Sequence, residues 1–164
     1  MSKVVLKLGD DVSTDIIYPG RFMATVLPTE TPQYAFADLV EFNGRVKKKE
    51  ITPQSVIVAG KNFGCGSSRE QAASCLKGPD FIVIARGFAR IFLQNSINLG
   101  LMTIICPDFE ADEGDELQIS ATQVVNTTSG KTFEIVPLPK ARQAIIDAGG
   151  LIPYTRQRLV QAKR

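Results

Sequence analysis

One short segment gathers most of the residues that could do chemistry in this chain. It runs Gly60-Lys61-Asn62-Phe63-Gly64-Cys65-Gly66-Ser67-Ser68-Arg69-Glu70. Glycines let a backbone turn tightly and come close to a ligand. Ser67 and Ser68 supply hydroxyls, and Arg69 supplies a guanidinium whose fork matches a carboxylate. These residue types predict a site for a small anion, with Gly66, Ser67, Ser68 and Arg69 around it.

The flanking residues predict how this glycine segment is held. Val56–Ala59 is an apolar run of the kind found in buried strands, and residues 69–77 are compatible with a helix. The first N–H groups of a helix have no partner within the helix, and they favour an anion. The predicted order is therefore strand, glycine segment and helix, with the anion at the start of the helix.

A purely structural interpretation of the same segment is open. Ser67 or Ser68 could be only the N-cap of the helix, with Glu70 or Gln71 completing a capping box. The segment lacks the Gly-Lys-Ser/Thr ending of a Walker phosphate loop and the Gly-x-Gly-x-x-Gly spacing of a dinucleotide fold. Turn chemistry alone does not choose between a cap and an anion site.

The composition excludes several classes of mechanism. The 164 residues include no His, so the chain encodes no Ser-His-Asp triad and no Cys-His pair. Cys65, Cys75 and Cys106 are widely spaced and form no C-x-x-C pair, so we expect no metal ligands and no cofactor in this chain. Cys65 is predicted to fill a tight turn rather than to act as a reactive thiol. Acid–base chemistry would need carboxylates, Lys, Tyr, an unusual Ser, or groups from another polypeptide.

Charge and hydropathy limit the expected partners. The net charge of +2 is too small to favour nucleic acid, and Lys47–Lys49 is predicted to be a solvated loop. No apolar stretch reaches the roughly 18 residues that a membrane helix needs. The first residues lack the architecture of a signal peptide. We therefore expect a cytoplasmic protein that binds neither nucleic acid nor membrane.

The rest of the chain predicts one mixed α/β domain over residues 1–164. Alternating short strands and helices in its middle indicate parallel pairing with crossovers, and the strands after Pro107 are expected to be antiparallel. Strands are predicted at 4–8, 56–59, 81–85, 102–105, 116–120, 124–125 and 132–136. Helices are predicted at 33–40, 69–77, 89–98, 140–148 and 151–160, with a polar loop at 9–15 and an extended surface loop at 21–33.

Four segments together resemble the aconitase swivel domain, which exists as a free-standing small subunit in 3-isopropylmalate dehydratase and its relatives. They occur in the family's order and cover nearly the whole chain. They are Asn62–Glu70; Gly9–Gly20, similar to a Gly-Asp-x-x-x-Thr-Asp opening; Ala85–Phe92, in which Gly87 replaces the usual Ser; and Gly149–Leu151. The resemblance implies a three-layer β/β/α swivelling fold.

The resemblance also implies a chemistry. Members of the family dehydrate a 2-hydroxy diacid and rehydrate the product, which moves the hydroxyl by one carbon. At the matching positions, Ser67 would abstract the proton next to a carboxylate, and Ser68 and Arg69 would bind the substrate carboxylate. Asp15 would lie beside the site and orient partner groups, although it could equally be an Asx-turn residue.

The same resemblance implies a partner. A large subunit would hold a four-iron four-sulfur cluster and supply the acid–base histidines, so this chain would be inactive alone. The implied hydro-lyase isomerises 2-isopropylmalate and 3-isopropylmalate in leucine biosynthesis. A free small subunit could also self-associate through surface that a missing partner would cover.

The loop after Pro19-Gly20 is where family members differ in substrate. Phe22, Met23 and Ala24 are apolar, whereas members acting on tricarboxylates are expected to place an Arg here. An apolar pocket favours an aliphatic substituent, at about 1–3 kcal/mol for one methylene. Phe22 and Met23 could instead pack on the core, and an inward Arg21 would favour a more acidic substrate. The alternatives are a hydratase for citramalate, 2,3-dimethylmalate or homocitrate, and a non-catalytic swivel module that only binds a ligand.

Overall fold

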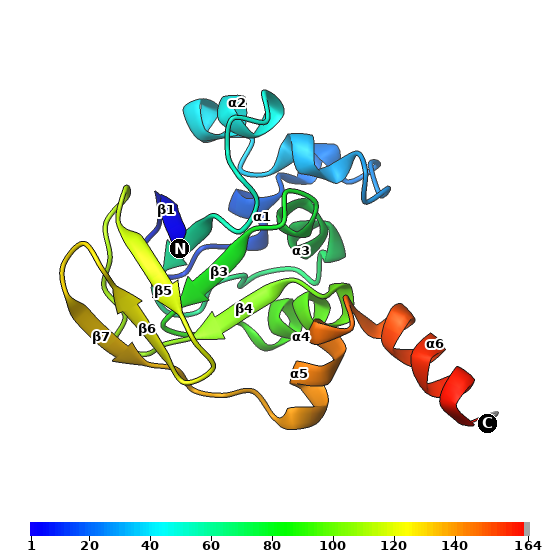
Figure 1. Cartoon of the computed structure of the whole chain (residues 1–164). Coiled ribbons are helices and arrows are strands. Elements are labelled where there is room, and N and C mark those ends of the chain that lie inside the picture. Colours follow the sequence, from blue (N-terminus) through cyan, green and yellow to red (C-terminus); the bar gives the residue numbers. More distant parts are fainter. Residues whose placement is uncertain (163–164) are drawn as a thin grey trace.

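A single seven-stranded sheet runs through the computed structural model, which describes residues 1–162 (Figure 1). The strands lie in the order β4-β3-β2-β1-β5-β6-β7. They are β1 (Ser2–Lys7), β2 (Val56–Ala59), β3 (Ile82–Ala85), β4 (Met102–Ile105), β5 (Glu116–Ile119), β6 (Gln123–Asn126) and β7 (Lys131–Glu134). As predicted, β2 to β4 pair in parallel and β5 to β7 pair antiparallel. The first strand, β1, pairs in parallel with β2 and antiparallel with β5. The last two residues of the expected domain, 163–164, lie outside the described residues.

The helices connect and cover these strands. They are α1 (Thr14–Ile17), α2 (Val40–Lys47), α3 (Glu70–Lys77), α4 (Arg90–Leu99), α5 (Lys140–Asp147) and α6 (Leu151–Ala162), with 3-10 turns η1 (Gly20–Phe22) and η2 (Thr31–Tyr34). The order β2-α3-β3-α4-β4 gives the two predicted parallel crossover units. Within residues 1–162, no helix is long and apolar enough to cross a membrane.

The alternation of side chains along the parallel strands divides the core in two. In β2, Ile57 and Ala59 pack toward α3 and α4, whereas Val56 and Val58 pack against Leu117 of β5. Successive residues of a strand point to opposite faces, so one apolar strand serves both cores. The result is a helical layer, a parallel layer and an antiparallel layer, which confirms the predicted β/β/α fold (Figure 1).

The sheet curls strongly enough to bring its two ends together. The Val136 N–H, just after β7, donates to the Ile105 carbonyl of β4 at 2.9 Å. The antiparallel strands therefore fold back over the parallel ones and leave the opposite side of β1 to β3 to the helices. The glycine segment that follows β2 emerges at the end of this parallel layer.

The predicted helix over residues 33–40 is wrong. The chain makes the short turn η2, and Phe36 then adopts a left-handed φ of 49°. The Phe36 N–H donates to the carbonyl of Ile17 at 2.8 Å, and the Phe36 side chain is fully buried. A long-range hydrogen bond and a buried ring thus replace the local helix, and the helix forms later, as α2.

Two smaller predictions also need correction. The polar loop at 9–15 ends in the one-turn helix α1, because Ser13 caps it by accepting from the Ile16 N–H at 3.3 Å. Lys47 ends α2 instead of lying in a loop, although Lys47–Lys49 is exposed, as expected. The predicted hairpin between 124–125 and 132–136 is confirmed as β6 and β7.

Candidate functional site

Hydrogen bonds join the glycine segment to the polar loop that follows β1. Each backbone bond links residues about fifty positions apart in the sequence. The Gly60 N–H donates to the Gly9 carbonyl at 3.0 Å, and the Asp11 N–H donates to the Lys61 carbonyl at 2.9 Å. Further along, the Gly64 N–H donates to the Val12 carbonyl at 2.7 Å, and the Thr14 N–H donates to the Cys65 carbonyl at 2.8 Å. The Lys61 N–H donates to the Asp10 carboxylate at 2.7 Å. The motif Gly9–Gly20 and the glycine segment Gly60–Glu70 are therefore hydrogen-bonded into one unit, which we call the platform.

Two glycines allow this platform to pack closely. Gly64 has a φ of 81°, and a Cβ placed there would lie 2.2 Å from Phe92 Cγ. Gly66 has a φ of 97°, and a Cβ there would lie 3.3 Å from the Thr14 hydroxyl. Both positions favour glycine by backbone conformation as well as by space. The predicted site residue Gly66 thus brings the chain against Thr14.

Ser67 follows Gly66 and is exposed, as is Ser68. The Ser67 carbonyl accepts from the Arg69 N–H at 2.8 Å and from the Thr14 hydroxyl at 3.1 Å. The Thr14 hydroxyl also lies 3.3 Å from the Ser67 hydroxyl. The backbone of Ser67 is held from two sides, while its side chain faces the surface.

The interpretation of Ser67 or Ser68 as a helix cap is wrong. Helix α3 begins at Glu70, and Arg69 occupies the N-cap position without a capping hydrogen bond from its side chain. The hydroxyls of both serines are therefore not used to close the helix. They are available in the turn ahead of it.

Arg69 lies against Asp15, the predicted site residue of the other motif. Its Nη1 donates to Asp15 Oδ1 and to the Tyr18 carbonyl, the latter at 3.2 Å. The Arg69 side chain is only 16% exposed, whereas that of Asp15 is 66% exposed. The hydrogen bond from Arg69, more than its charge, holds the pKa of the Asp15 carboxyl below its usual value. The Gly20 N–H also donates to Asp15, at 3.2 Å, so the carboxylate is fixed between two donors.

The apolar loop borders this pair. Phe22 is half-buried and stacks on Tyr34 with 4.2 Å between ring centroids, whereas Met23 and Ala24 are exposed. The Gln71 side chain, in the first turn of α3, donates to the Met23 carbonyl at 3.4 Å. The loop is therefore tied to the start of the same helix that Arg69 precedes.

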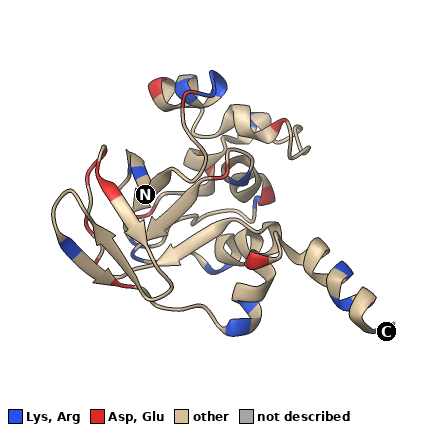
Figure 2. Ribbon diagram, viewed as in Figure 1, with Lys and Arg blue, Asp and Glu red and all other residues tan. Residues whose placement is uncertain are grey.

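Arg21 does not turn toward this site. It pairs with Asp38, and its guanidinium lies 4.7 Å from the centre of the Phe22 ring. Figure 2 shows acidic and basic residues spread over many elements, with Asp and Glu gathered ahead of and within β5. The Arg21 guanidinium is thus engaged by Asp38, whereas that of Arg69 is engaged by Asp15.

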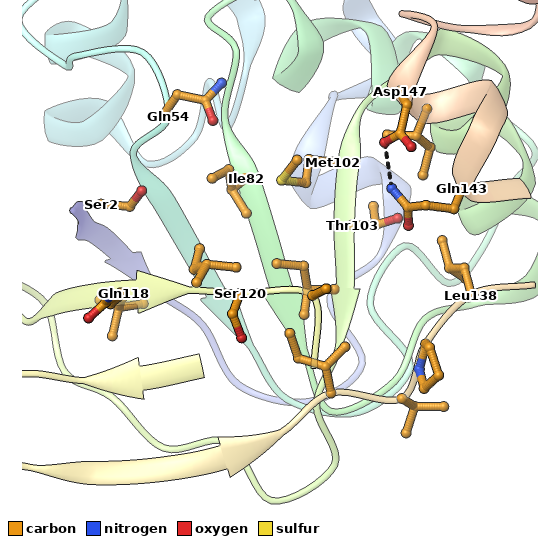
Figure 3. A pocket seen from close by; sticks show the side chains of 18 of the residues that line it. Ser2, Gln54, Ile82, Met102, Thr103, Gln118, Ser120, Leu138, Gln143 and Asp147 are labelled. Atoms are coloured by element: carbon orange, nitrogen blue, oxygen red, sulfur yellow. Dashed lines mark hydrogen bonds between the residues drawn. The ribbon is translucent and has the colours of Figure 1, made fainter. Parts of the chain in front are cut away.

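The site is an open surface and not an enclosed pocket. A cavity of about 750 Å³ lies elsewhere, between side chains of β3, β4, β5 and α5 (Figure 3). Its lining is mostly apolar, with a hydrogen bond of 2.8 Å between Gln143 and Asp147, and it includes none of the predicted site residues. The cavity and the residues predicted from the sequence therefore lie in different parts of the molecule.

The cysteines do not gather near one another. Cys75 and Cys106 are buried, and burial raises the pKa of the Cys106 thiol to about 11 and that of Cys75 further. Cys65 is half-buried in the glycine segment. Across residues 1–162, no three His, Cys, Asp or Glu side chains are grouped so that they could hold a metal ion. The residues described here therefore do not fit an iron–sulfur cluster.

Sequence reasoning assigned no role to Thr14. Its position beside Asp15 was the available signal, because the motif that contains Asp15 also contains Thr14. A threonine in a polar loop gives no sign of its burial, and Thr14 is only 2% exposed. Only the hydrogen bonds to the glycine segment show that its hydroxyl meets Ser67.

Comparison with known proteins adds independent findings. Residues 11–108 match the aconitase C-terminal domain family. The 3-isopropylmalate dehydratase small subunit of Methanosarcina mazei is 44% identical over 156 residues, which is 92% of this chain and 93% of that protein. The isopropylmalate/citramalate isomerase small subunit of Methanocaldococcus jannaschii is 39% identical over 97% of this chain and 95% of its own length.

A solved structure agrees with these similarities. The crystal structure of 3-isopropylmalate dehydratase from Methanocaldococcus jannaschii superimposes with a TM-score of 0.87 and is 41% identical. The alignment covers 98% of this chain and 96% of that one. Ser67 and Arg69 lie within residues 11–108, the range that matches the family.

Proposed function

Because the chain belongs to the 3-isopropylmalate dehydratase small subunits of the aconitase family, we propose that it completes a hydro-lyase that interconverts 2-isopropylmalate and 3-isopropylmalate. The family is the one that the sequence motifs predicted. The observation that carries the proposal is the similarity to relatives of this name over nearly the full chain. The small-subunit names of these relatives imply a large-subunit partner.

The openness of the site supports the idea of a shared active centre. Ser67 and Ser68 are exposed on a surface, and the Asp15 carboxylate beside them is largely in solvent. Proton transfer from a weakly acidic C–H needs fixed donors in a place from which water is excluded. This chain offers the donors without the enclosure, so we assign the enclosure to the large subunit.

Ser67 is the proposed base. Its Oγ first gives its own proton to solvent. As the alkoxide it then takes the proton from the carbon next to a substrate carboxylate: the O–H bond forms, the C–H bond breaks, and the electron pair passes into the carboxylate. Ser68 and Arg69 bind that carboxylate, and Gly66 lets the backbone approach it. Both side-chain hydrogen bonds of Arg69 to described residues leave from Nη1, and we assign Nη2 and Nε to the carboxylate.

Asp15 acts on Arg69 and not on the substrate in this proposal. Its carboxylate fixes one corner of the guanidinium, and the Gly20 N–H fixes the carboxylate in turn. A guanidinium held this way loses little freedom when a ligand arrives. Asp15 is thus a positioning residue, in place of the partner-orienting role or the Asx turn considered from the sequence.

The cofactor belongs to the large subunit in this proposal. No cysteine set of this chain fits a cluster, and Cys75 and Cys106 are buried thiols. A four-iron four-sulfur cluster held by the partner would supply the Lewis acid for the substrate hydroxyl. We place the assembly in the cytoplasm, and free small subunits could self-associate in the absence of the partner.

The apolar loop points to the substrate class. Met23 and Ala24 are exposed next to the start of α3, and the nearby Arg21 is engaged by Asp38. An aliphatic substituent is therefore preferred over a third carboxylate. A second candidate substrate is citramalate, because one close relative is named an isopropylmalate/citramalate isomerase.

Reconstitution tests this proposal. The chain is co-expressed with the large subunit, and turnover is followed in the ultraviolet through the unsaturated diacid, with isopropylmalate, citramalate, 2,3-dimethylmalate and homocitrate in turn. Ser67→Ala is expected to lower kcat at least about a hundredfold. Binding without turnover of any of these acids would instead favour a non-catalytic module. Near-normal turnover by Ser67→Ala would remove Ser67 as the base.

A further inference from the structure

We propose that the Thr14 hydroxyl is a positioning group for Ser67, which holds the Ser67 hydroxyl at rest and donates a hydrogen bond to it when it becomes an alkoxide. This inference rests on the proposed role of Ser67 as base. It concerns a residue to which neither the motifs nor the comparisons assign a role.

The contacts place Thr14 where such a donor is needed. Its hydroxyl oxygen is 3.3 Å from Ser67 Oγ and 3.1 Å from the Ser67 carbonyl oxygen. A hydroxyl has one proton to donate and two lone pairs that accept. At rest, Thr14 donates to the carbonyl and accepts from the Ser67 hydroxyl. Both hydroxyl groups are then satisfied.

Loss of the Ser67 proton changes this pattern without moving a heavy atom. Rotation about the Thr14 C–O bond turns its proton from the carbonyl to the charged Oγ of Ser67. The carbonyl keeps a partner, because the Arg69 N–H donates to it at 2.8 Å. A hydrogen bond to a charged acceptor contributes about 1.5–3 kcal/mol, roughly twice the neutral kind. The exchange therefore favours the alkoxide.

The hydroxyl of Thr14 is held in place beforehand. Thr14 is 2% exposed, its N–H donates to the Cys65 carbonyl at 2.8 Å, and its carbonyl accepts from the Tyr18 N–H at 2.8 Å. Gly66 presses against it, since a Cβ at Gly66 would lie 3.3 Å from the hydroxyl oxygen. Donors that need no rearrangement at the moment of reaction are the ones that stabilise developing charge best.

A second threonine–serine pair provides a matched control. Thr31 Oγ1 lies 2.9 Å from Ser74 Oγ, and both residues are buried. This pair joins η2 to α3, and among the described residues neither hydroxyl hydrogen-bonds a proposed site residue. Thr31→Val removes a comparable hydroxyl contact, so it reports what loss of such a contact does to folding alone.

The experiment compares Thr14→Val, Thr14→Ser, Thr31→Val and Ser67→Ala in the reconstituted two-subunit enzyme. Thr14→Val is expected to lower kcat about ten- to a hundredfold. The acidic limb of its pH profile should move to higher pH, because the Ser67 alkoxide has lost a donor. KM should change little, and Thr14→Ser, which keeps the hydroxyl, should recover most of kcat. Thr31→Val should keep the wild-type kcat and acidic limb.

The outcomes separate this inference from the function it rests on. If Thr14→Val and Thr31→Val show the same kcat and the same acidic limb, Thr14 has no special role. If Ser67→Ala retains turnover, the proposed base itself fails. If Ser67→Ala loses turnover and Thr14→Val does not, only the role of Thr14 is rejected. Should Thr14→Val fail to assemble, Thr14→Cys, a poor donor of similar size, replaces it in the comparison with Thr14→Ser.

Discussion

Replacement of Arg69 by Lys tests the proposed carboxylate clamp most directly. The change keeps the positive charge and removes the planar fork. Both hydrogen bonds of Arg69 to described residues leave from Nη1, toward Asp15 and the Tyr18 carbonyl. A lysine can meet Asp15 with its one ammonium group, but it cannot at the same time present two further N–H groups to a ligand in a fixed plane.

The expected loss of activity follows from the number of hydrogen bonds that Arg69 can donate to the carboxylate. A carboxylate on Nη2 and Nε would accept two charge-assisted hydrogen bonds, each contributing about 1.5–3 kcal/mol. Arg69→Lys should lose at least one of them, which corresponds to about a ten- to hundredfold fall in kcat/KM. The fall should appear in kcat as well as in KM, because the carboxylate that Arg69 binds gains further negative charge when the electron pair of the C–H bond passes into it.

A matched control separates this effect from a general loss of structure. Arg86 also donates to a main-chain carbonyl, that of Phe109 at 3.3 Å, and pairs with a carboxylate, Glu110 at 3.7 Å. Arg86→Lys should leave KM for isopropylmalate near the wild-type value. Steady-state kinetics of both variants in the reconstituted enzyme give the answer. An unchanged kcat/KM in Arg69→Lys, or an equal fall in both variants, would refute the clamp.

Two further predictions concern stability. Gly64→Ala should lower the free energy of unfolding by about 2–4 kcal/mol, because its Cβ would meet the buried Phe92 ring and because φ is positive there. Urea denaturation measures the loss, and Gly130→Ala is the control, because φ is also positive there but the space is open. Equal losses in the two variants would contradict a contribution from packing. Above about pH 5, Asp15→Asn should have a lower melting temperature than the wild type, and this gap in melting temperature should close as the pH falls below about 4. The sign follows because Arg69 holds the pKa of the folded Asp15 carboxyl below its unfolded value, so the stabilisation exists above that range and is lost on acidification. A gap that stays constant from pH 3 to 7 would mean that the pair does not contribute.

Some features of this protein follow from local sequence. The run at Val56–Ala59 was predicted with the bounds that the structure has, because four consecutive apolar residues can be buried only where both faces of a strand are covered. The strand Met102–Ile105 also has its predicted bounds, although Met102 is exposed. The family was identified from motifs whose residue types are fixed by turn geometry and anion chemistry. The absence of His excluded whole mechanisms before any fold was known.

Other local patterns gave the wrong answer where distant partners competed. Helical spacing at 33–40 did not form a helix, because the Phe36 N–H found the Ile17 carbonyl and its ring found the core. Ser67 and Ser68 suited a helix cap by type, yet the cap position fell on Arg69. In each case, a contact made by the folded chain contributed more than the preference of a few neighbouring residues.

The sequence by itself determined which chemical groups this protein has, and the tertiary structure alone decided which of them meet. Arg69 and Asp15 are 54 positions apart, and Thr14 and Ser67 are 53 apart. The residues next to each of these side chains do not encode the contacts between them. The contacts arise only when the loop after β1 and the segment after β2 are hydrogen-bonded side by side. The physical reason is that parallel neighbours place the ends of distant strands at one edge of the sheet.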